Sequence, residues 1–216
     1  MVASDAVNEE DIDKLIIPDD LPEEPTFKAY IEATVYDKEG HIIDYRRQPM
    51  KSLTQYFLAL MSIPLIGTYS SSSSSSSTGL LANTLGLPSE ISTEYVANIT
   101  WAWSIQVGSG SQSFSPTLTG LAAPIANGTG SGQLSYSTTS VSYTASSISI
   151  LGTVGNSTSS AVNVTEIGLT CTVYIQYSTS GTSTYTCLLS YDTFSTAISI
   201  PAGGMATFQI VISFTG

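Results

Sequence analysis

The chain has 216 residues, of which 42% are apolar but only 11% are charged, whereas a typical soluble domain carries roughly 25% charged residues. This length and apolar content suffice for one sizeable β domain or two small ones. The net charge of −11, with no Lys or Arg beyond position 51, excludes a nucleic-acid footprint on residues 52–216, because phosphates require basic partners.

The charges divide the chain into two chemically different parts. All six basic residues lie at or before Lys51, and so do thirteen of the seventeen acids, because the only later ones are Glu90, Glu94, Glu166 and Asp192. A surface of Ser, Thr, Asn and Gln stays hydrated at any pH, whereas carboxylates lose their charge near pH 4. We therefore expect an exterior that is exposed to acid or carries sugar.

Residues 1–26 are predicted to form an extended acidic arm, because residues 1–25 carry nine acids, one Lys and three prolines. The start of the chain has neither a basic nor an apolar signal region, so we expect no secretory signal and, for lack of a long apolar run, no transmembrane segment. The arm also contains apolar residues that we expect to dock on a neighbouring subunit: Ile12, Leu15, Ile16, Ile17 and Leu21.

Residues 27–67 are predicted to form a docking segment of two strands and a helix. The stretch FKAYIEATVY alternates strictly, which is typical of a half-buried strand, and DKEG turns it into a second strand, HIIDYRR. The next stretch, PMKSLTQYFLALMSIP, has Pro49 where a helix can begin, apolar residues at helical spacing and Pro64 where a helix ends. The sequence therefore predicts one helix there.

Eight consecutive serines, Ser70–Ser77, lie in a segment, 68–83, that is either a linker or a long loop within one continuous sandwich. Beyond it, residues 84–216 are predicted to form a β-sandwich domain. Short apolar-alternating stretches separated by Gly, Ser and Pro predict an all-β, antiparallel sandwich or jelly roll. The predicted strands lie near 95–107, 133–143, 146–154, 162–175, 184–190, 196–200 and 205–215.

Two kinds of covalent modification are predicted on this domain. Cys171 and Cys187 end a strand–turn–strand stretch, so we expect a disulfide between them, the alternative being two unpaired buried thiols. Four sequons predict a glycan at one or more positions, namely Asn98, Asn127, Asn156 and Asn163.

No catalytic residue, metal site or cofactor is predicted. His41 is the only histidine and lies in the predicted hairpin, and no nucleotide-binding, serine-hydrolase or zinc-protease motif occurs. A carbohydrate-binding or glycosidase domain is an alternative. It requires Trp101 and Trp103 exposed on a concave face, or two body carboxylates within about 10 Å of each other.

Several stretches carry a resemblance to a known class of proteins. These are IQVGSGSQSFSP, LAAPIANGTGSGQLSY, VTEIGL, CLLSYDTFS and ISIPAGGMATFQIVISF, together with YIEATVYDKEGHII and the following YFLAL. Over residues 27–216 they resemble β-sandwich virion proteins of archaeal viruses and thermophile phages, nearest to capsid or vertex proteins of turreted icosahedral viruses of hot-acid archaea. The resemblance implies a jelly-roll subunit that packs around a symmetry axis, as a penton base or turret does.

The sequence thus predicts a non-enzymatic virion structural protein on the outer capsid or vertex. Its expected partners are copies of itself and other virion proteins, with glycans on its surface. The alternative is a subunit of an extracellular archaeal pilus or thread, in which a strand from one subunit completes the sheet of the next.

Overall fold

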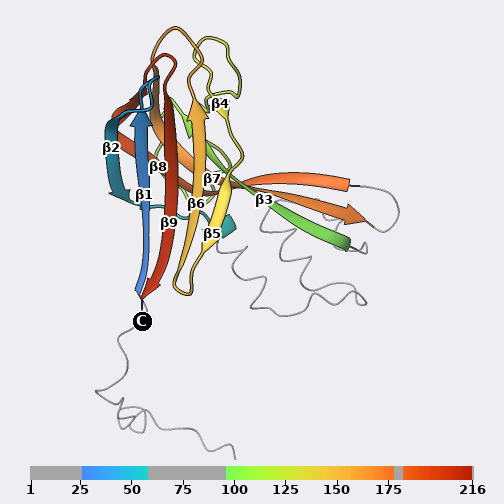
Figure 1. Ribbon diagram of the computed structural model, residues 1–216. Helices are drawn as coiled ribbons and strands as arrows, with labels where there is room; N and C mark the ends of the chain where they lie inside the picture. The colour runs from blue at the N-terminus through green and yellow to red at the C-terminus, as the bar shows by residue number, and fades with distance from the viewer. Residues whose placement is uncertain (1–25, 58–95, 178–181, 216) are drawn as a thin grey trace, which may run out of the picture.

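The computed structural model describes residues 26–57, 96–177 and 182–215, which form two antiparallel sheets. The larger, six-stranded sheet has the order β2-β1-β9-β6-β4, with β5 also paired to β6, and the smaller has the order β3-β7-β8 (Figure 1). The predicted all-β, antiparallel sandwich is confirmed. The strands are β1 (Thr26–Tyr36), β2 (Ile42–Pro49), β3 (Val96–Gly108), β4 (Ser135–Tyr136), β5 (Ser140–Tyr143), β6 (Ser147–Gly155), β7 (Val162–Tyr177), β8 (Thr182–Ile200) and β9 (Met205–Thr215).

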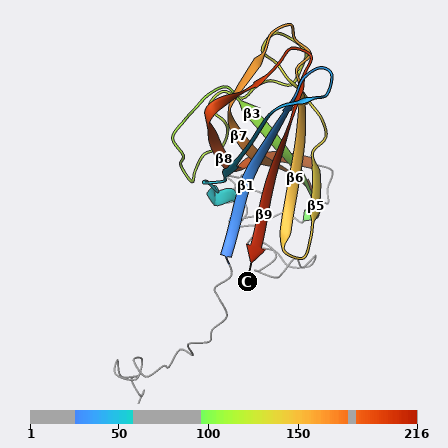
Figure 2. The same cartoon turned by 60° about the vertical axis from the view of Figure 1, so that its left-hand side comes forward.

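One hydrophobic core lies between the two sheets. Figure 2 shows β1, β9 and β6 side by side in one layer. Their alternate residues are buried, as the strand pattern predicted for Ile31, Ala33 and Val35. From the smaller sheet, Leu169 and its neighbours on β7 and β8 belong to the same core, and Phe194 on β8 meets Phe208 on β9 with ring centroids 6.2 Å apart.

The two N-terminal strands belong to the sandwich, so the predicted division between a docking segment at 27–67 and a domain at 84–216 is wrong. Strand β1 pairs along its whole length with β9, from Thr26 opposite Thr215 to Tyr36 opposite Met205, and β2 pairs with its other edge. The physical reason is that the apolar face of β1 needs a sheet to cover it, and the C-terminal strand supplies the neighbour.

The predicted helix is largely replaced by extended chain in the described residues. Pro49 ends β2 instead of starting a helix, and only residues 55–57 are helical, while 58–67 lie outside the described residues. The intervening segment runs along β8: Thr54 N–H donates to the carbonyl of Leu189 at 2.9 Å, and Leu53 bridges Ser190. The free edge of β8 thus satisfies backbone groups that a helix would have satisfied internally.

The smaller sheet extends beyond the sandwich. Its long strands continue to one side as a three-stranded projection (Figure 1), in which 96–101 pair with 173–177 and 173–176 pair with 182–185. The strands predicted at 184–190 and 196–200 are one continuous strand, β8, whose register with β7 shifts at two places. The arm at 1–25, with its five docking residues, and the serine segment 68–83 lie outside the described residues.

Candidate functional site

The exposed and half-buried charged side chains of the described residues lie on β1, β2 and the segments joined to them, which we call the charged corner. Its cations are Lys28, Lys38, Arg46, Arg47 and Lys51, and its acids are Glu32, Asp37, Glu39 and Asp44. The other acids in the part of the chain that the structure describes, Glu166 and Asp192, are buried. The corner is therefore the charged part of the described surface.

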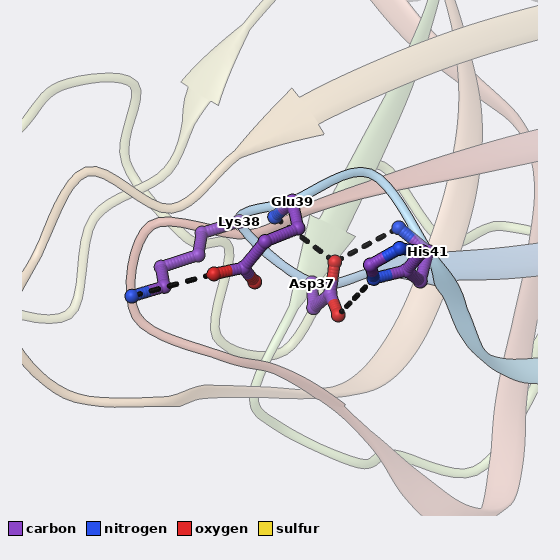
Figure 3. A network of polar contacts seen from close by, with 4 residues as sticks. All are labelled: Asp37, Lys38, Glu39 and His41. Atoms are coloured by element: carbon purple, nitrogen blue, oxygen red, sulfur yellow. Dashed lines mark hydrogen bonds and ion pairs between the residues drawn. The ribbon is translucent and has the colours of Figure 1, made fainter.

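The turn from β1 to β2 is organised by one carboxylate. Asp37 Oδ1 accepts the backbone N–H groups of Glu39 and His41, at 3.0 and 2.8 Å, and Asp37 Oδ2 lies 3.1 Å from His41 Nδ1 (Figure 3). The His41 N–H bond lowers the pKa of Asp37, and the His41 ring and the Glu39 N–H lower it further, against a smaller opposing effect of desolvation. Gly40 has a φ of 88°, a conformation that favours glycine. His41 is thus a turn residue, as predicted.

Most charged side chains of β2 form ion pairs, hydrogen bonds or ring contacts within the charged corner. Arg46 forms an ion pair with Asp44 at 2.9 Å and donates from Nη1 to the carbonyl of Thr196 at 2.6 Å, which ties β2 to β8. Arg47 stacks on the ring of Tyr30, with 3.8 Å from Cζ to the centroid, and lies 3.5 Å from Glu32. These contacts hold two strands and one edge of the sandwich together.

Two exposed lysines differ from these paired cations. Within the described ranges Lys28 and Lys51 form no ion pair, and both are exposed. Lys28 lines a groove of about 570 Å³ formed by residues 27–30 of β1 and 47–50 at the end of β2, and Lys51 follows directly. The sequence predicted the two strands but not this groove, because the groove depends on where β2 ends relative to β1.

Glu166 is a buried carboxylate that fastens a loop to the outer face of the smaller sheet. Its side chain is fully buried and accepts the backbone N–H groups of Ala123 at 2.7 Å, Ala122 at 3.0 Å and Gly110 at 3.2 Å. Beneath the same loop, Tyr191 OH accepts Gln112 N–H at 2.8 Å. Each donor belongs to the 109–125 loop, so Glu166 has a structural role in this arrangement.

Asp192 is the second buried carboxylate and faces the opposite side of the sheet. It lies opposite Ile167 in the β7–β8 register and receives the backbone N–H of Lys51 at 3.2 Å on each carboxylate oxygen. Burial raises the pKa of Asp192 to about 6, although the N–H groups of Lys51 and Ser52 and the charge of Lys51 act in the other direction. The group thus changes charge in a mildly acidic range.

The two buried carboxylates lie closer together than the non-enzymatic interpretation predicted. Glu166 pairs with Thr193 and Ile167 with Asp192, so they are one register step apart on adjacent strands. Strand alternation nevertheless separates them: Glu166 faces the loop that covers the sheet, whereas Asp192 lies on the side of Ile167 and faces the segment before the short helix. This arrangement differs from the glycosidase pair, in which both carboxyl groups face one substrate.

The two cysteines lie directly opposite each other across β7 and β8, as the predicted hairpin required. In this structure both thiols are free and buried, and the Cys187 thiol donates to the Cys171 carbonyl at 3.4 Å. Burial raises the pKa of Cys171 to about 12 and that of Cys187 to about 11, so both are protonated near neutral pH. The disulfide stays a prediction, because the structure brings the residues together without forming the bond.

The four sequons have different environments. Asn156 is 1% exposed, and its Nδ2 donates to the carbonyls of Ser160, Ile200 and Pro201 at 2.9–3.0 Å. A sugar on Nδ2 would displace these bonds, so the fold disfavours Asn156 among the four candidate positions. Asn127 and Asn163 are exposed and stay candidates, and the backbone of Asn98 lies in β3.

The conditions for a sugar-binding face are met only in part by the described residues. Trp103 is half-buried and packs against the core, and the side chain of Trp101 lies outside what the structure describes. The described ranges contain no cluster of three or more His, Cys, Asp or Glu residues suited to a metal ion. Within them, no helix is long and apolar enough to cross a membrane.

The comparisons with known proteins gave no match: no family model fits the chain, and no curated protein or solved structure is significantly similar to it.

Proposed function

We propose that this protein is a non-enzymatic structural subunit of a virus particle, placed on the outer capsid or at a vertex, where it associates with copies of itself. The observation that carries the proposal is the distribution of charge over the sandwich. Exposed charges of the described residues occupy one corner, and the remaining surface is built mainly from Ser, Thr, Asn, Gln and Gly.

This distribution suits a subunit that meets acid on one side and other subunits on another. Uncharged polar groups keep their hydrogen bonds to water when the pH falls, so that part of the surface keeps its solubility without ionisation. The charged corner, by contrast, offers directional contacts to a partner of complementary charge. The resemblance of residues 27–216 to virion β-sandwich proteins is the reason for naming a virus particle.

The buried carboxylates agree with a structural role. Glu166 and Asp192 each bond to backbone N–H groups of segments that they hold against the smaller sheet. A general acid or base must face the proton that it transfers, in a site that a substrate can reach. Both carboxylates instead face the protein's own backbone.

Light scattering of the purified full chain tests the proposal. We expect oligomers of defined size, and rings or closed shells in negative-stain images, because symmetric association is the usual outcome for identical subunits. Deleting residues 1–25 should leave the β circular-dichroism spectrum unchanged and abolish association. A full chain that stays monomeric at all concentrations would contradict the proposal, and open helical threads would favour a filament subunit instead.

A further inference from the structure

We propose that the groove at the charged corner, formed by residues 27–30 and 47–50, binds the acidic arm, residues 1–25, of a second copy of the chain. The inference rests on the proposed function, since it names the contact through which subunits associate. It concerns one end of the larger sheet, where β1 begins and β2 ends.

Charge complementarity is the first support. The corner keeps two exposed lysines that are not in ion pairs within the described residues: Lys28, which lines the groove, and Lys51, which follows it. Arg47, held on the face of Tyr30, also lines the groove. The arm carries nine carboxylates and a single lysine, so it is the strongly acidic segment of a chain whose cations are concentrated at this corner.

Apolar complementarity is the second support. Besides Tyr30, Gln48 and its cations, the groove is lined by four apolar residues, and one of them, Phe27, keeps 43% of its surface exposed. The four apolar residues of the groove are Phe27, Ala29, Pro49 and Met50. Its volume of about 570 Å³ lies in the range of pockets that take a few apolar groups. The arm contains the apolar residues that were predicted to dock on a neighbouring subunit; the last of them is Leu21, and two acids, Glu23 and Glu24, follow it.

The groove is better placed to bind the arm of a second copy than the arm of its own chain. The arm joins β1 at Thr26, next to Phe27, so its own residues could enter the groove only by reversing direction immediately before the strand. Pro22 and Pro25 oppose such a reversal, because proline fixes its own φ and biases the preceding residue toward extended conformations. An arm that continues away from its own sheet reaches a neighbouring subunit.

A charge-swap experiment on the full chain tests the contact. The arm variant carries Asp19→Lys, Asp20→Lys, Glu23→Lys and Glu24→Lys, and the corner variant carries Lys28→Glu and Lys51→Glu. Each variant alone should associate at least ~10-fold more weakly than the wild type in sedimentation velocity, because like charges then face each other. A mixture of the two should associate again, since the reversed arm of one subunit meets the reversed corner of the other.

The matched control is Lys38→Glu, which reverses an exposed lysine in the β1–β2 turn, outside the groove, and should leave association unchanged. Circular dichroism verifies that each variant folds. If the reversed corner does not fold, the milder Lys28→Ala and Lys51→Ala pair replaces it and should weaken association by ~3-fold, as loss of exposed ion pairs predicts.

The outcomes separate this contact from the proposed function. A wild-type chain that never associates overturns both. Wild-type association that neither variant weakens overturns the groove contact alone. If the mixture does not associate but a single chain carrying both sets of changes does, each arm binds its own subunit, and the exchange between copies is wrong.

Discussion

The charged corner and the smaller sheet use polar groups in opposite ways. The corner has many charges, most of them exposed and joined in pairs such as Arg46–Asp44 and Lys38–Glu39. The described part of the smaller sheet has two charged groups, Glu166 and Asp192, and both are buried. Glu166 accepts three backbone N–H groups, and both carboxylate oxygens of Asp192 accept the backbone N–H of Lys51. The buried carboxylates are thus fully occupied by the protein's own backbone, whereas the exposed Lys28 and Lys51 of the corner form no ion pair within the described residues and are available for association.

The largest effect should come from removing the Glu166 carboxylate. Glu166→Ala leaves three loop N–H groups without their acceptor, so we expect a loss of ~3–5 kcal/mol in the free energy of unfolding, measured by urea titration. The matched change in the corner, Glu39→Ala, should cost less than ~0.5 kcal/mol, because that side chain is exposed. Equal effects of the two changes would remove the distinction between the regions.

Asn156→Asp tests the distinction between buried and exposed polar groups at a side chain that is uncharged in the wild type. The substitution replaces an amide that donates to three carbonyls by a carboxylate that faces them, so we expect ~2–4 kcal/mol of destabilisation at neutral pH. Asn163→Asp, at an exposed sequon, serves as the control and should change stability by less than ~0.5 kcal/mol. Glycopeptide mapping from a glycosylating host should find Asn156 bare, and a glycan there in folded protein would contradict its burial.

Asp192 should make the free energy of unfolding of the sandwich depend on pH. The folded pKa of about 6 lies above the ordinary value of 3.8, so the folded state binds more protons than the unfolded state between these values. The contribution of Asp192 to stability is therefore largest below pH ~4 and is lost as the pH rises through ~6, a change of up to ~3 kcal/mol. Asp192→Asn should remove this slope and be more stable than the wild type at pH 7. Parallel slopes in urea titrations from pH 4 to 7 would show that Asp192 is not the cause.

The smallest effect on stability should come from the corner itself. Lys28→Glu changes an exposed side chain outside any ion pair of the described residues, so we expect a change within ~0.5 kcal/mol in the free energy of unfolding. The comparison becomes sharper if the same substitution weakens association while leaving the urea midpoint of the dilute protein in place. A large loss of stability would show that Lys28 contributes to folding, which contradicts a role of the charged corner in association alone.

The sequence alone was sufficient to predict where the strands lie, because the alternation of apolar and polar residues is a local pattern. The alternation around Ile31, Ala33 and Val35 identified β1 and its buried face, and the stretch between Cys171 and Cys187 identified a hairpin with opposed thiols. The composition also located all six cations and thirteen of the seventeen acids in the first 51 residues, since counting requires no knowledge of contacts.

The tertiary structure decided which residues meet, and these contacts contradicted local patterns in several places. Strand β1 pairs on one edge with β2 and on the other with β9, which is nearly the whole chain away, so the charge boundary is not a domain boundary. The free edge of β8 draws the segment around Thr54 into extended pairing, where a helix was predicted. The burial of Asn156 and the bonds of Glu166 to the 109–125 loop could not be predicted from the sequence for the same reason. Burial and hydrogen-bond partners depend on segments that are distant in sequence, whereas alternation depends only on neighbouring residues.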